Sequence, residues 1–195
     1  MKKTAWLTGV LLLAACGTTV ERLDVEAVRD LSGAWNDTDS RLVSEEMVAD
    51  LLSRDWLAAF RRERGAQPAV IVGGIRNLSH EHINVVTFIN DIERALINSG
   101  KVDFVASREE RDDIRAERAD QDLNAASVTR KPMGRERGAD FMLKGDISTI
   151  VDVEGRRQVR FYQVDLTLIS LADNRKVWVG QKKIKKYITG AKLRP

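Results

Sequence analysis

The chain has 195 residues, 43% of them hydrophobic and 31% charged, a composition that is typical of one folded domain. Lysine and arginine number 32 against 29 aspartate and glutamate residues, and without Lys2 and Lys3 the balance is 30 against 29. This near-neutral balance excludes a general electrostatic argument for a nucleic-acid partner.

The first sixteen residues are typical of a lipoprotein signal peptide with its cleavage site. Lys2 and Lys3 precede an apolar run over residues 5–15, which is too short to cross a bilayer as a helix. The last four residues resemble the lipobox read by lipoprotein signal peptidase: Leu13, Ala14, Ala15 and Cys16. We expect residues 1–15 to be removed and the Cys16 thiol to accept a diacylglycerol that holds the chain at a membrane. The alternative is an ordinary secretory signal.

Residues 16–38 are expected to form the lipidated cysteine and a short tether, because they show no strong hydrophobic periodicity. A globular domain should occupy residues 39–188, followed by a basic tail over 189–195. The domain begins with one long predicted helix, which Asp39 or Ser40 can cap and which ends at Gly65. Its apolar residues recur at every fourth position: Val48, Leu52, Trp56 and Phe60.

A short buried strand is predicted over residues 69–72, ended by Gly73 and Gly74, with a polar loop over 76–83. A second helix should start at Asn84, since apolar residues then recur at 85, 88, 89, 92 and 96 on one face. Residues 101–106 favour another strand.

The next predicted helix opens with a capping box made by Ser107 and Glu110, and its charged sequence indicates an exposed position. After a loop over 121–130, Pro132 suits the first turn of a short helix that Gly138 ends.

From Phe141 the apolar period changes to two, which predicts three strands joined by turns at 152–155 and 172–174. The strands cover residues 141–151, 159–170 and 176–181 and form an antiparallel meander. The fold class is therefore α+β, with a small mixed sheet flanked by helices. The core is expected to include three residues of the middle strand and three of the second helix: Val164, Leu166, Leu168, Phe88, Ile92 and Leu96.

Four segments in this order, behind a lipobox, resemble the LpoB-type penicillin-binding protein activators: 100–107 (GKVDFVAS), 138–141 (GADF), 164–168 (VDLTL) and 177–180 (VWVG). That family is similar in fold to the N-terminal domain of TolB. The resemblance implies a non-catalytic lipoprotein of the outer membrane whose domain faces the periplasm. Its implied partner is a bifunctional penicillin-binding protein, whose glycan polymerisation and peptide cross-linking it stimulates.

Sorting to the outer membrane is implied because Gly17 and Thr18 place no aspartate after Cys16. Activators of this type carry a long, proline-rich tether, whereas this tether is short and proline-free. A partner protein other than a bifunctional penicillin-binding protein is therefore an open alternative. One alternative is an assembly lipoprotein of an outer-membrane secretion or surface-polymer system, similar to CsgG.

No catalytic or metal-binding set can be assembled from the sequence, so no enzyme activity, cofactor or small-molecule substrate is expected. His80 and His82 form the only histidine cluster, and a solvated loop is favoured over a metal site, which would need further ligands. A ligand-binding or enzymatic lipoprotein that uses these histidines is the least favoured function. The candidate partner surface, chosen for its exposure, comprises residues of the polar loop and the charged helix: Arg76, Asn77, His80, His82, Arg108, Arg111 and Arg115.

The C-terminal segment after Asp173 contains no acidic residue and carries a candidate basic patch: Lys182, Lys183, Lys185 and Lys186. Lysines can protect an edge strand from pairing with another chain. The same lysines could bind an acidic partner, anionic headgroups or an anionic wall polymer.

Overall fold

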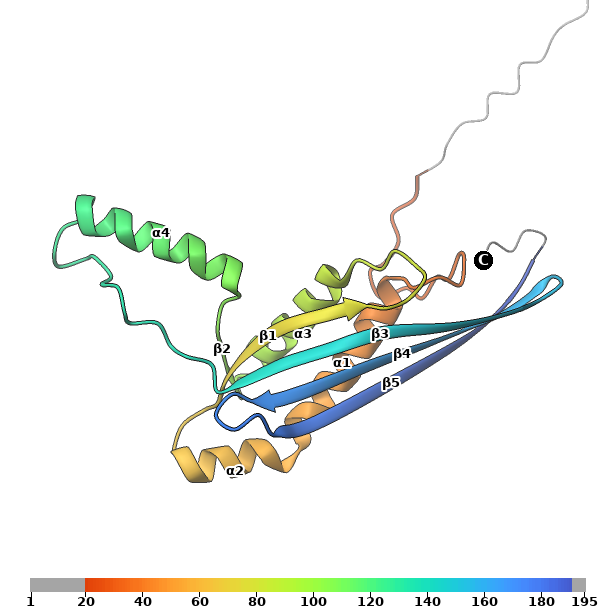
Figure 1. Cartoon of the computed structure of the whole chain (residues 1–195). Helices are drawn as coiled ribbons and strands as arrows, with labels where there is room; N and C mark the ends of the chain where they lie inside the picture. Colours follow the sequence, from red (N-terminus) through yellow and green to blue (C-terminus); the bar gives the residue numbers. More distant parts are fainter. Residues whose placement is uncertain (1–19, 191–195) are drawn as a thin grey trace, which may run out of the picture.

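The computed structural model describes residues 20–190, which form five strands and four helices around one mixed sheet (Figure 1). The helices are α1 (Asp37–Ser53), α2 (Asp55–Arg64), α3 (Val85–Asn98) and α4 (Arg108–Asn124). The strands are β1 (Ala69–Asn77), β2 (Asp103–Phe104), β3 (Phe141–Glu154), β4 (Arg157–Ser170) and β5 (Lys176–Thr189). The signal peptide, the lipobox with Cys16 and residues 191–195 of the predicted tail lie outside the described residues.

The strand order is β2-β1-β3-β4-β5, with β1 parallel to β2 and β3. The pairs β3–β4 and β4–β5 are antiparallel, so the predicted C-terminal meander and the α+β class are confirmed.

The core lies between the sheet and helices α1 and α3, which cover the same face (Figure 1). Alternate residues of β4 point into it, and Val164, Leu166 and Leu168 are at most 1% exposed. Phe88 and Ile92 of α3 are fully buried against them, and so is Leu96, as the periodicity predicted. The residues that alternate with these on β3, β4 and β5 form the opposite face, called here the open face, which no helix of the described residues covers.

The single long helix predicted from Asp39 to Gly65 is wrong, because Arg54 divides it into α1 and α2. Arg54 is extended, with φ −88° and ψ 157°, and the indole Nε1 of Trp56 donates to the carbonyl of Leu51 at 2.8 Å. The apolar spacing continues across the break, so periodicity could not reveal it.

The start of α1 also differs from the expectation. Asn36 caps it in place of Asp39 or Ser40, through a reciprocal capping box with Asp39 at 3.0 and 3.1 Å. The predicted capping box between Ser107 and Glu110 is confirmed, and α4 has no buried residue.

The first strand does not end at Gly73 and Gly74 but continues to Asn77 through a bulge between Val72 and Ile75. A Cβ on Gly73 would lie 2.9 Å from the sulfur of Met142, so this glycine permits close approach of β3. The predicted polar loop is therefore shorter, starting at Leu78.

Three further boundaries were wrong. The predicted strand over 101–106 pairs only at Asp103–Phe104, because it is an edge strand whose chain turns at once toward α4. Residues 132–138 contain no helix, since Gly134 has a φ of +75°. Strand β5 extends beyond residue 181 to Thr189, as exposed residues continue to alternate with partly buried residues that face the helices.

Candidate functional site

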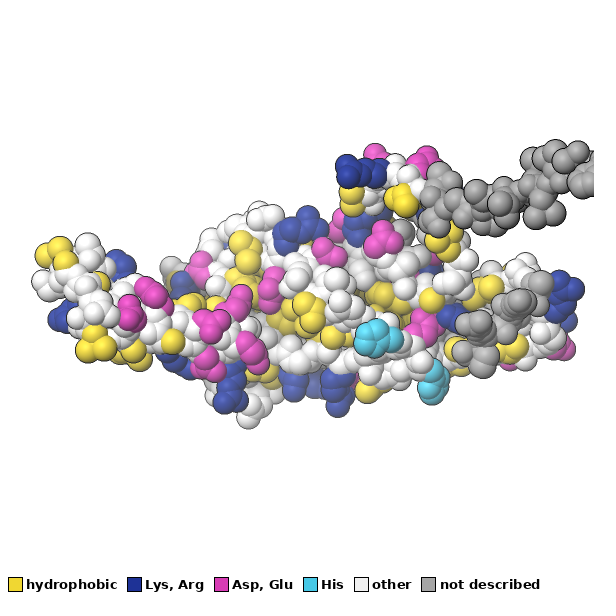
Figure 2. Space-filling view, turned by 90° about the horizontal axis from the view of Figure 1, so that it is seen from above, with side chains coloured by type: hydrophobic (Ala, Val, Ile, Leu, Met, Phe, Trp, Pro, Cys, Tyr) yellow, Lys and Arg dark blue, Asp and Glu magenta, His cyan; other side chains and the backbone are white. Residues whose placement is uncertain are grey.

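The two histidines of the loop do not form a metal site in the described part of the structure. His80 and His82 are both exposed on the surface (cyan in Figure 2), whereas Glu81 between them turns inward. Within residues 20–190, no group of three His, Cys, Asp or Glu side chains could hold a metal ion. No helix in the same range is long and apolar enough to cross a bilayer.

Glu81 is the centre of a half-buried polar network that the sequence analysis missed. Its Oε1 accepts from the Tyr162 hydroxyl at 2.7 Å and from Arg160 at 2.6 Å, and its Oε2 accepts from the backbone N–H of Trp35 at 3.1 Å. Burial, together with the hydrogen bond to Glu81, raises the pKa of Tyr162 well above its ordinary value of 10.0. Tyr162 is the residue from which the sequence could have predicted this network, since a tyrosine at a core-facing position needs a partner for its hydroxyl.

The network holds residues 30–36, called here the strap, against the domain. Trp35 packs edge-on against Phe88 and Tyr162, with ring centroids 6.3 and 5.6 Å away. The Tyr162 hydroxyl also lies 3.3 Å from the carbonyl oxygen of Gly33. A Cβ on Gly33 would meet the side chain of Ile188 on β5 at 2.3 Å, so the strap passes close to that strand. The last part of the predicted tether is therefore docked on the domain.

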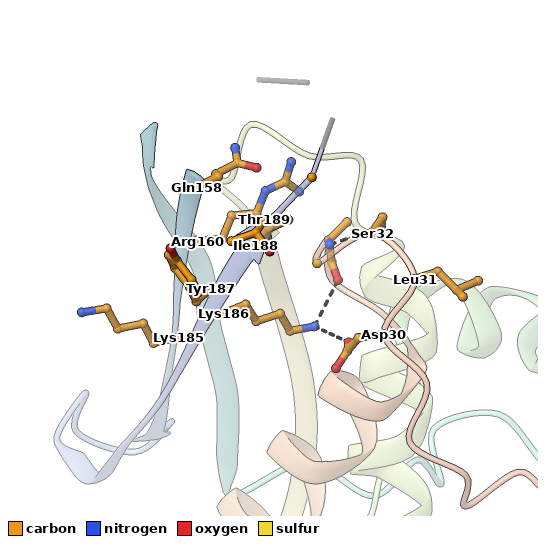
Figure 3. Close-up of a pocket in the computed structure, with 13 residues that line it drawn as sticks. Asp30, Leu31, Ser32, Gln158, Arg160, Lys185, Lys186, Tyr187, Ile188 and Thr189 are labelled. Carbon is orange, nitrogen blue, oxygen red and sulfur yellow. Dashed lines mark hydrogen bonds and ion pairs between the residues drawn. The ribbon is translucent and has the colours of Figure 1, made fainter. Parts of the chain in front are cut away.

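Lys186 fastens the strap to β5 (Figure 3). Its Nζ donates to Asp30 at 2.9 Å, to Asp39 at 2.6 Å and to the carbonyl oxygen of Ala34 at 3.2 Å. Burial disfavours the charged ammonium, but the bonds to Asp39 and Asp30 outweigh it and hold the pKa of Lys186 above its ordinary 10.5. The same bond from Lys186 lowers the pKa of Asp30 below its ordinary 3.8.

A groove of about 890 Å³ lies between the strap and the end of β5 (Figure 3). Gln158 and Arg160 of β4 line it, together with residues 185–189 of β5 and Gly190. The side chain of Gln158 is only 2% exposed, and its Nε2 has no hydrogen-bond partner among the described residues. The groove is thus largely polar, and the strap forms one of its walls.

The candidate partner surface falls into two places near opposite ends of β1 (Figure 1). Arg76 and Asn77 end β1, with His80 and His82 in the following loop, whereas Arg108, Arg111 and Arg115 belong to α4. Helix α4 follows β2, which pairs with the start of β1, so the length of β1 separates the two groups. Eight residue steps of a strand span about 26 Å.

Ion pairs already partly neutralise both groups. Arg76 lies 2.6 Å from Asp146 on β3, and Arg115 lies 2.8 Å from Glu136. Exposed pairs of this kind contribute little to stability, so they leave these arginines available to a competing partner.

The candidate basic patch also divides, because alternate residues of β5 point to opposite faces of the sheet. Lys182 and Lys186 turn toward the helices and pair with Glu46 and Asp39. Lys183 and Lys185 lie on the open face and form no ion pair within residues 20–190. Only these two lysines remain candidates for an anionic partner.

Comparison with known proteins gives one family and several similar structures. A family model described as peptidoglycan-synthase activator LpoB matches residues 39–184. The C-terminal domain of LpoB from Escherichia coli is 16% identical, with a TM-score of 0.47, and the match covers 76% of this chain and 99% of that one. Lipoprotein GNA1162 from Neisseria meningitidis is 12% identical, with a TM-score of 0.37, covering 64% and 87%. The search of curated proteins finds no match.

Proposed function

Because the chain belongs to the LpoB family of peptidoglycan-synthase activators, we propose that it is an outer-membrane lipoprotein that binds and activates a bifunctional penicillin-binding protein. The family is non-catalytic, so the chain acts by contact with the synthase. The observation that carries the proposal is the extent of the family match, which runs from α1 into β5 and so includes both helices of the core and the whole sheet except the end of β5.

The membrane part of the proposal rests on the sequence. The lipobox ending at Cys16 supports lipidation, and the absence of aspartate at Gly17 and Thr18 supports the outer membrane. In this arrangement the domain lies in the periplasm, and its partner lies in the inner membrane.

Helix α4 is the better supported of the two candidate partner surfaces. It projects from the end of the molecule opposite the strap and packs no buried residue against the domain (Figure 1). A standard protein interface needs about 800 Å² on each partner, which an exposed helix and its neighbouring loop can supply. Arg108, Arg111 and Arg115 are the candidate contacts there, and the loop group around Arg76 is the alternative.

Charge-reversal variants can distinguish which of the two candidate surfaces contacts the synthase. Association of the purified domain with a purified bifunctional penicillin-binding protein should slow as salt rises, because screening acts beyond about 8–10 Å at physiological ionic strength. Arg108→Glu should slow it further, and Arg76→Glu, which reverses an exposed arginine at the other end, should not. Slower association of Arg76→Glu, with unchanged association of Arg108→Glu, would assign the contact to the loop around Arg76. Unchanged association in both variants would reject both surfaces.

Crosslinking in the cell followed by capture of the chain tests the partner itself. A bifunctional penicillin-binding protein is the expected prey. Capture of an outer-membrane secretion or polymer-export component in its place would reject the activator and favour the assembly lipoprotein.

A further inference from the structure

The far end of the meander carries an exposed group of apolar side chains. Here it is called the meander tip and comprises residues 150–161 and 183–189, around the turn between β3 and β4 and the end of β5. Ile150 is 66% exposed, Val153 49% and Tyr187 65%. Apolar side chains so exposed at the end of a sheet commonly mark a contact surface.

Strand register places Ile150 and Tyr187 on the open face, whereas Val153 pairs with Gln158 and points to the opposite face. Ile150 pairs with Phe161, and Phe161 with Lys185. In the next row of the same face, Val159 lies between Asp152 and Tyr187. Apolar and aromatic side chains therefore form a patch with Lys185 and Asp152 at its edge.

The charge of the meander tip is positive. Its two segments contain six basic and two acidic residues. Arg160 and Lys186 are already bound to carboxylates, whereas Lys183, Lys185 and Arg156 form no ion pair within the described range. Apolar and aromatic side chains beside unpaired basic groups are the combination that suits the interface of an anionic bilayer.

The strap brings this surface close to the proposed anchor. It docks beside residues 185–190, so only fourteen residues, 16–29, separate the lipid on Cys16 from the docked chain. A flexible segment of that length has a mean span of about 20 Å, and fully extended it reaches about 50 Å. The meander tip is thus held within reach of the bilayer at a high effective concentration.

We propose that the meander tip rests on the surface of the anionic bilayer that holds the anchor. Ile150 and Tyr187 enter the headgroup region, and Lys183 and Lys185 contact lipid phosphates. The orientation rests on the proposed lipidation of Cys16. It leaves α4 directed away from the bilayer, toward the partner (Figure 1).

The test uses the unlipidated chain from residue 17, which keeps every described helix and strand because the first of these begins at Asp37. The chain should sediment with vesicles of phosphatidylglycerol and phosphatidylethanolamine and much less with phosphatidylcholine vesicles. The double variant Ile150→Ser/Tyr187→Ser should lower the partition coefficient about tenfold. Val179→Ser is the matched control, since Val179 is 61% exposed on the same face at the other end of β5, and it should change nothing.

A second variant, Lys183→Glu/Lys185→Glu, should lower binding to the anionic vesicles alone. Equal binding of all variants, or no binding to any vesicle, would overturn the proposal. Self-association without vesicles that the serine double variant abolishes would assign the patch to a second copy of the chain. The assay contains no synthase, so its failure would leave the activator function standing.

Discussion

The hydroxyl of Tyr162 on β4 donates to Oε1 of Glu81, 2.7 Å away in the loop before α3. This bond joins the middle of the meander to the loop, and Glu81 joins both to the strap through the backbone of Trp35. One half-buried carboxylate thereby connects three segments that lie far apart in the sequence.

Replacement of Tyr162 by phenylalanine should lower the free energy of unfolding by about 1–3 kcal/mol, because Glu81 loses a buried hydrogen-bond donor. Tyr187→Phe is the matched control, since Tyr187 is 65% exposed, and its free energy of unfolding should not change. Urea denaturation of the two variants provides the measurement. Equal midpoints would show that the Tyr162 bond contributes nothing to stability.

Lys186→Met should return the pKa of Asp30 toward its ordinary 3.8, because the hydrogen bond that lowers it is removed. An NMR titration of the Asp30 carboxyl measures the change, with Lys185→Met as the control. A titration of Asp30 identical to that of the wild type would show that the strap is not fastened by Lys186.

The pH range of this contact follows from the two shifts. The lowered pKa of Asp30 gives a stabilising contribution above pH 3.8 that is lost as the pH falls through the lowered value. The raised pKa of Lys186 gives a second stabilising contribution. It is present below pH 10.5 and is lost as the pH rises through the raised value. The strap should therefore stay docked at every pH between these limits.

Leu166→Ala should cost about 2–5 kcal/mol, because it leaves a cavity in the core. Leu166 is 1% exposed and lies among the fully buried residues of α3 and β4. Val179→Ala, at an exposed position of the neighbouring strand, should stay within about 0.5 kcal/mol of the wild type. An unchanged denaturation midpoint for Leu166→Ala would contradict the register of β4.

Cys16→Ala should give an uncleaved or soluble periplasmic species that no longer sediments with membranes. The expected cause is the loss of the thiol that accepts the lipid. Incorporation of labelled palmitate into this variant at the wild-type level would contradict lipidation at Cys16.

The sequence predicted the elements whose hydrophobic period is long and regular. Helix α3 and the alternation along β4 are examples, since burial of one face dictates both patterns. The break at Arg54 escaped prediction because the apolar spacing on either side of it continues unchanged. The bulge at Gly73 escaped because a glycine marks both the end of a strand and a close approach between strands.

The polar network around Glu81 could not be predicted from the sequence for a different reason. Glu81 belongs to a polar loop, and only the folded chain brings it beside Tyr162 and Trp35. The two groups of the candidate partner surface were chosen by exposure, which gives no information on distance, and the structure places them near opposite ends of β1.

The rate of glycan polymerisation by a purified bifunctional penicillin-binding protein, with and without residues 20–195 of this chain, tests activator function most directly. Every bifunctional synthase of the same cell is assayed, and the heat-denatured chain serves as the control. Direct binding and a higher rate with at least one synthase are expected. No binding and no stimulation with any of them would contradict the activator function and leave the assembly lipoprotein as the better explanation.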